Sequence, residues 1–205
     1  PLGIKCTEIR PEKTFEYTMF EQPHKGKHDG IIRYGYGWCG GFCREGTRQK
    51  KLFLDRYCEA LEDVVVYVGI AFDEVNRTPD KPYKKHPLKD WGYSQADCLE
   101  INRQNGIEWL EETDMTESGY IDLYSILDRV SCWCCANKNL WELYNIWYYF
   151  HNTYWQGLKD MQSRFDMPMK KFKNKKFGEY GNVFSLEKVF ESGYVPKHRK
   201  RSDQN

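Results

Sequence analysis

One uninterrupted apolar run limits the fold of this chain more than any other feature. The segment Val64-Val65-Val66-Tyr67-Val68-Gly69-Ile70 is dominated by β-branched side chains. Such a run is typical of a β-strand covered on both faces, because a strand with one solvated face shows alternating polar residues. The run therefore predicts a central strand of a mostly parallel sheet.

Helical patterns flank this strand. Ser94, with Asp97 three residues later, predicts the start of a helix that ends at Gly106. An aromatic helical segment is expected over residues 139–160, with a break at Asn152 or Gly157. Further expected elements are helices over 14–21, 48–61 and 185–190, a short strand over 4–9, and a basic loop over 165–181. This order predicts a doubly wound α/β fold with a mostly parallel sheet and a helical C-terminal addition.

The charge of the chain is balanced overall. Its 31 Lys and Arg residues stand against 30 Asp and Glu residues, so bulk electrostatics do not indicate a nucleic-acid or membrane partner. Basic residues nevertheless cluster in 170–176 and 197–201. These clusters are either solvated loop and tail or a docking surface for a protein or nucleic acid. No apolar run approaches the roughly 20 residues of a membrane span, so we expect no membrane partner and a cytoplasmic location.

Two pairs of closely spaced cysteines predict a metal site. Cys39 and Cys43 lie in a glycine-rich loop, and Cys132 and Cys135 form a Cys-x-x-Cys pair that also contains Cys134. Short spacing lets two sulfurs reach one ion, and thiolates suit zinc or an iron–sulfur cluster. The alternative is that these are buried thiols with an accidental spacing. The remaining cysteines, Cys6, Cys58 and Cys98, are interpreted as core residues.

A charged loop follows the predicted central strand. Ligands of open α/β sheets bind beyond the carboxyl ends of the strands, which is where Asp73, Glu74 and Arg77 lie in the sequence. Arg77 offers a planar fork for phosphate or sulfate, and an acidic neighbour can hold a ribose or orient the guanidinium. An ordinary solvated loop is the alternative interpretation.

Several of these segments together resemble the phosphoadenosine phosphosulfate (PAPS) reductase family, a member of the adenine-nucleotide α-hydrolase-like group. The resemblance covers roughly residues 1–160. It is carried by the order and spacing of the segments Arg10–Phe20, Trp38–Lys51, Val66–Arg77, His86–Gly92 and Ser131–Cys135. It implies a PAPS reductase-like domain over residues 1–165 and a basic C-terminal extension with one short helix over 166–205.

The resemblance also implies roles for particular residues. Arg77 would contact the anionic end of an adenine nucleotide or sulfonucleotide, and Lys50 or Lys51 would add positive charge. The remaining members of the nucleotide loop would be Gly69, Asp73 and Glu74. The four paired cysteines would correspond to those that hold a [4Fe–4S] cluster in some family members, with zinc as the alternative.

Two departures from the family pattern leave two function classes open. The Ser-Gly-Gly-Lys-Asp-Ser-like phosphate loop that opens the family's fold does not occur here, and no cysteine follows Cys135. We expect either a fragment of a longer domain, a sheet completed by a second polypeptide, or a protein that has lost nucleotide hydrolysis. One class is an enzyme with sulfur-related transferase or reductase chemistry. The other is a non-catalytic interaction module, associated with mobile elements or defence, that four cysteines hold together.

Overall fold

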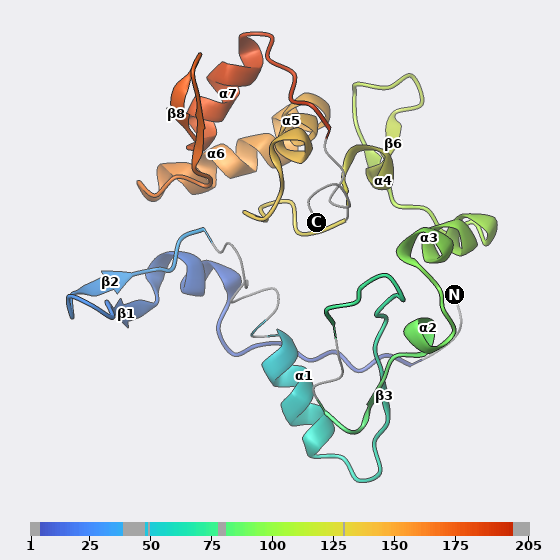
Figure 1. Cartoon of the computed structure of the whole chain (residues 1–205). Coiled ribbons are helices and arrows are strands. Elements are labelled where there is room, and N and C mark those ends of the chain that lie inside the picture. Colours follow the sequence, from blue (N-terminus) through green and yellow to red (C-terminus); the bar gives the residue numbers. More distant parts are fainter. Residues whose placement is uncertain (1–4, 39–47, 49, 78–80, 129, 199–205) are drawn as a thin grey trace. The chain divides into compact units, whose positions relative to one another are not determined.

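The computed structural model describes residues 5–38, 48, 50–77, 81–128 and 130–198 (Figure 1). Contacts between Cα atoms divide the chain into two units. The first unit contains Pro1–Ile9 and Lys51–Trp109, and the second contains Arg10–Lys50 and Leu110–Asn205. Each unit is described by itself. The predicted boundary after residue 165 falls inside the second unit.

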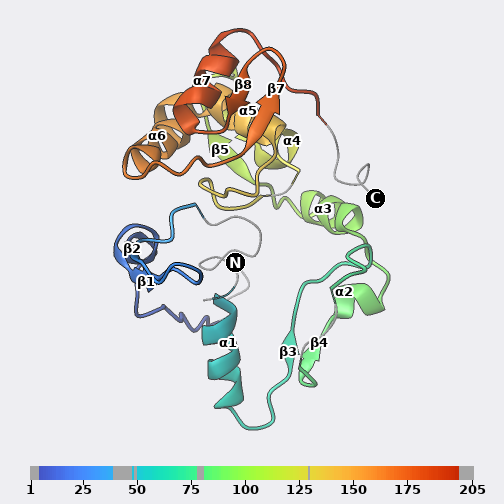
Figure 2. The same cartoon turned by 60° about the vertical axis from the view of Figure 1, so that its left-hand side comes forward.

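The first unit contains the predicted central strand in a shortened form. Strand β3 (Val66–Tyr67) pairs in parallel with β4 (Lys84–Lys85), as Figure 2 shows. Val66 is half-buried but Tyr67 is 72% exposed, so burial alternates along β3 where the sequence predicted cover on both faces. The described residues form four separate two-stranded sheets, and the doubly wound sheet therefore stays a prediction.

Three helices complete the first unit: α1 (Lys50–Glu59), α2 (Pro87–Asp90) and α3 (Gln95–Gln104). The start of α3 is confirmed, because the Ser94 side chain accepts a hydrogen bond from Asp97 N and the Asp97 carboxylate accepts one from Ser94 N. Gly106, at φ +70°, follows the helix in the left-handed region, as a C-terminal glycine does. Residues 5–9 hold no strand, so that prediction is wrong for the described part of 4–9.

Among its described residues, the second unit contains helices and three antiparallel hairpins. Its elements are η1 (Tyr17–Glu21), β1 (Pro23–Lys25), β2 (Ile32–Tyr34), β5 (Leu110–Glu112), β6 (Tyr120–Asp122), α4 (Leu123–Ile126), α5 (Leu140–Tyr149), η3 (His151–Trp155), α6 (Gln156–Ser163), β7 (Phe172–Asn174), β8 (Gly178–Tyr180) and α7 (Val183–Glu191). Helices α5, α6 and α7 lie together beside β7 and β8 (Figure 2). Their shared core includes Leu143, Trp155, Leu158, Val183 and Leu186, all with 0% exposure.

The long aromatic segment is helical with an interruption, as predicted, and the interruption includes Asn152 but not Gly157. It begins at Phe150 (φ −132°, ψ 39°), after which the π-helical turn η3 leads into α6. Gly157 serves packing instead, because a Cβ there would lie 3.0 Å from Cη2 of Trp133. Glycine therefore allows the close approach of the indole, which a larger residue would have to displace.

The segment 165–181 is not the basic loop that its composition predicts. It forms the hairpin β7–β8, in which Phe172 faces Tyr180 with ring centroids 5.5 Å apart. Tyr180 is buried and belongs to the helical core. Aromatic residues thus order a lysine-rich segment whose charge alone favours a loop. Within the part of the chain that the structure describes, no helix is long and apolar enough to cross a membrane.

Candidate functional site

The loop after β3 is organised by the carboxylate of Glu74. Its Oε2 accepts a hydrogen bond from Ala71 N (3.2 Å), and its Oε1 accepts one from Arg77 Nη1 (2.8 Å). Glu74 thus ties the start of the loop to its end. The Arg77 side chain remains 59% exposed, so this pairing adds little to stability but orients the guanidinium.

Asp73 fastens the same loop to the following helix. Its Oδ1 accepts a hydrogen bond from Gln95 N (3.0 Å), the first backbone amide of α3, and its Oδ2 lies 3.4 Å from Gln95 Nε2. The structure therefore brings Asp73, Glu74 and Arg77 together as predicted. Gly69 lies at the start of this loop, where a Cβ would meet only Leu88 at 3.9 Å, so the space does not require glycine.

The segment after β4 adds two residues that the sequence interpretation did not select. Lys89 Nζ donates a hydrogen bond to Arg77 O (3.1 Å), which places an ammonium group beside the arginine loop. His86 is 5% exposed, and its Nδ1 has no hydrogen-bond partner among the described residues. Because β3 and β4 are parallel, both segments leave the pair at its carboxyl end, where α/β sheets bind ligands.

The two lysines at the start of α1 are not part of this loop. Lys51 Nζ lies 2.6 Å from Asp55 Oδ2, one helical turn away, and Lys84 Nζ lies 2.7 Å from Asp55 Oδ1. Burial alone would raise the pKa of Asp55, but the hydrogen bonds from the two lysines lower it overall. The pair of Asp55 with Lys84 thus joins α1 to β4, and Lys51 adds a second positive charge to the same carboxylate. Lys50 is exposed at the first position of α1 and is assigned to the second unit.

The second candidate site is the turn that contains the Cys-x-x-Cys pair. Cys135 N donates a hydrogen bond to Cys132 O (3.0 Å), which closes a tight turn with Cys132 exposed and Cys135 half-buried. Cys39 and Cys43 lie outside the described residues. Among the residues that the structure does describe, no three His, Cys, Asp or Glu side chains are grouped to hold a metal ion. The donor set of a two-cysteine turn fits a soft metal that takes its remaining ligands from elsewhere.

A buried lysine supports this turn. Lys138 is 2% exposed, and its Nζ donates a hydrogen bond to Ser131 Oγ (2.9 Å). Burial lowers the pKa of Lys138, while the negative charges of Glu142 and of the cysteines in the turn oppose that shift. Lys138 thus places an amine near the sulfur atoms of the turn. Sequence interpretation missed Lys138, because only the fold buries it.

Glu142 joins the segment that precedes the cysteine turn to α5. It is 1% exposed, and its carboxylate accepts hydrogen bonds from Asn139 N (2.7 Å) and Asp128 N (3.2 Å). The Asn139 side chain in turn accepts from Glu142 N (2.9 Å), which completes a capping box. The spacing Asn-x-x-Glu before an apolar helix is the signal that could have identified this anchor.

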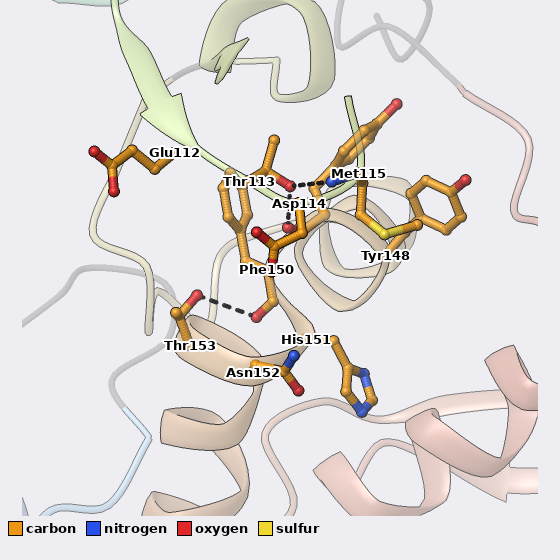
Figure 3. Close-up of a pocket in the computed structure, with 10 residues that line it drawn as sticks. Glu112, Thr113, Asp114, Met115, Tyr148, Phe150, His151, Asn152 and Thr153 are labelled. Carbon is orange, nitrogen blue, oxygen red and sulfur yellow. Dashed lines mark hydrogen bonds between the residues drawn. The ribbon is translucent and has the colours of Figure 1, made fainter. Parts of the chain in front are cut away.

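A cavity of about 220 Å³ opens at the interruption between α5 and η3 (Figure 3). Thr113 Oγ1 donates a hydrogen bond to Tyr149 O (2.6 Å), and Thr153 Oγ1 donates one to Phe150 O (3.4 Å). Figure 3 shows Asp114 above the gap and His151 below it. π-Helical turns often accompany functional sites, and this cavity is large enough for a few water molecules or a small polar ligand.

The comparisons of this chain with family models, with curated proteins and with solved structures give no match.

Proposed function

We propose that this chain is a PAPS reductase-like adenine-nucleotide-binding protein whose chemistry is sulfur-related, of the transferase or reductase type. The observation that carries the proposal is the parallel pairing of β3 with β4, which sends the Arg77 loop and the Lys89 segment out of the same end of the pair. A phosphate or sulfate would bind there through Arg77 N–H groups that Glu74 does not engage, and Lys89 would add charge.

The proposed cofactor is a [4Fe–4S] cluster, with zinc as the alternative, held by Cys39, Cys43, Cys132 and Cys135. The turn at Cys132 and Cys135 and the buried Lys138 support a thiolate site. When bound, a cluster would supply an electron-transfer or structural centre. The residues of this chain would hold its thiolates and balance their charge.

The nucleotide part is tested by calorimetry with ATP and with PAPS on the full chain. Losing a charge-assisted contact typically costs about 1.5–3 kcal/mol, or roughly ten- to hundredfold in affinity. Arg77→Lys should weaken binding nearly as much as Arg77→Ala, because a lysine cannot make two parallel hydrogen bonds. The matched control is Arg56→Lys on the exposed side of α1, which should leave affinity unchanged. Equal affinities for Arg77→Ala and the control would remove Arg77 from the site.

The metal part is tested on anaerobically purified protein. The protein is expected to contain either iron with sulfide or zinc. A brown colour would identify the iron–sulfur cluster and not zinc. Cys132→Ser and Cys135→Ser should each lower the metal content, whereas Cys98→Ser, on α3, should not. Protein without iron and zinc, in which all eight thiols react freely in the native state, would refute the site.

The second candidate function is a non-catalytic interaction module. The folded, lysine-bearing hairpin β7–β8 favours it, because an ordered basic surface can dock a partner where a solvated loop would not. A nucleotide affinity too weak to measure, even with any upstream sequence restored, would leave this function in place of the enzyme.

A further inference from the structure

The hairpin β7–β8 combines aromatic residues that pack together with exposed lysines. Phe172 and Tyr180 face each other, and Phe177 packs against both Tyr180 and Tyr194, with centroids 6.1 and 5.6 Å apart. Side chains alternate along a strand, so the neighbours of Phe172 point to the opposite face. Lys171 and Lys173 are both exposed there.

These lysines line a groove of about 610 Å³ together with Lys170, the aromatic pair Phe172 and Tyr180 and, from the beginning of α7, Asn182 and Ser185. The base of the groove is closely packed. Lys170 N donates a hydrogen bond to Gly181 O (2.9 Å), and a Cβ on Gly181 would lie 1.9 Å from Lys170 O. The groove is therefore shaped by backbone contacts and not by mobile side chains alone.

One acidic residue lies beside Lys171 and Lys173 in the lining of the groove. Glu179 is the one acidic residue that lines it among the described residues, and it lies 3.5 Å from Lys173. Both side chains are more than three-quarters exposed, so this pair is weak and opens readily for a stronger anion.

The basic surplus is local to this part of the chain. Residues 166–205 contain ten Lys and Arg against five Asp and Glu, whereas residues 1–165 contain 21 against 25. The near-neutral total therefore conceals a positive C-terminal region. A local surplus of this kind attracts polyanions within the Debye length, about 8 Å at physiological salt.

We propose that the groove and the lysine face of β7–β8 bind the phosphodiester backbone of a nucleic acid. Lys171 and Lys173 lie two strand positions apart, about 6.5–7 Å. A ligand with regularly repeated anions, such as a phosphodiester backbone, matches this spacing better than a ligand with scattered carboxylates. Residues 166–198 contain no arginine, the residue type that most often reads base edges. The site therefore binds without sequence preference. It is independent of the nucleotide and cysteine sites.

The test is fluorescence anisotropy on the full chain with labelled 20-nucleotide probes of single-stranded DNA, duplex DNA and RNA. The probe variant is Lys171→Gln with Lys173→Gln, and the matched control is Lys27→Gln with Lys188→Gln, two exposed lysines elsewhere. The probe variant should lose affinity by about tenfold or more. It should also flatten the dependence of log K on log salt by about 1.4 for single strands and 1.8 for duplex. The control should change neither quantity.

Three outcomes would overturn the proposal. One is equal affinity of the probe and control variants. Another is loss of binding in a Lys197→Gln, Lys200→Gln variant while the hairpin variant still binds, which would assign binding to the terminal basic cluster. The third is competition by poly-glutamate as strong as that by unlabelled DNA at equal charge, which would favour an acidic protein partner. The relative affinities of the three probes identify the preferred nucleic acid.

Discussion

Replacing Glu142 by glutamine should destabilise the second unit substantially. The carboxylate is 1% exposed and accepts hydrogen bonds from two backbone amides, those of Asn139 and Asp128. A glutamine side chain presents one oxygen and one NH₂ group, so one of the two amides would face another donor. The buried ammonium of Lys138 would also lose a nearby negative charge.

The magnitude follows from these contacts. A lost hydrogen bond to a charged group costs about 1.5–3 kcal/mol, and an unsatisfied buried amide adds to that cost. We therefore expect Glu142→Gln to lower the free energy of unfolding by about 2–4 kcal/mol, a large share of the 5–15 kcal/mol typical of a domain. Asn139→Ala removes the cap and the hydrogen bond that Asn139 Nδ2 donates to Asp128 Oδ2 (2.7 Å), and it should cost about 1–2 kcal/mol.

Urea unfolding followed by tryptophan fluorescence measures this difference. The midpoint should fall while the slope m stays constant. Glu117→Gln, at an exposed position, is the control and should stay within about 0.5 kcal/mol of the original protein. Adding Lys138→Met should make the double variant less unstable than the two single effects predict, because it removes the uncompensated charge. A Glu142→Gln protein as stable as the control would refute the reasoning.

Three further predictions concern the same unit. The hydrogen bond to Glu111, with burial, raises the pKa of Tyr154 to about 12. The folded state then holds a proton that the unfolded chain releases near pH 10, so the stability that Tyr154 contributes is lost as pH rises from 10 to 12. Ultraviolet titration of Glu111→Gln should show the phenol ionising at a lower pH. Burial lowers the pKa of Lys138 below 10.5, so the unfolded chain binds more protons in the alkaline window below that value. The free energy of unfolding of the original protein should therefore rise, relative to that of Lys138→Met, as pH rises toward 10.5, as urea unfolding at several pH values would show. Leu158→Ala, at a 0% exposed core position, should cost about 2–5 kcal/mol by urea unfolding.

The helix starts could be read from the sequence because they depend on neighbouring residues. The pair Ser94 and Asp97 exchanges hydrogen bonds over three positions, so composition and spacing alone contain the necessary information. The close turn at Cys132 and Cys135 is local in the same sense. The helical character of the segment after Asn139 also follows from a pattern that repeats within a few residues.

The tertiary structure decided the features that depend on distant partners. The interruption after Tyr149 lies where Thr113, 36 positions earlier, donates to the Tyr149 carbonyl, and Asp73 holds Gln95 from 22 positions away. The lysine-rich segment became a hairpin because Phe172, Phe177 and Tyr180 found aromatic partners. Local propensity could not reveal these outcomes. Burial of these aromatic and polar side chains stabilises the structure only after the fold has brought the two distant segments together.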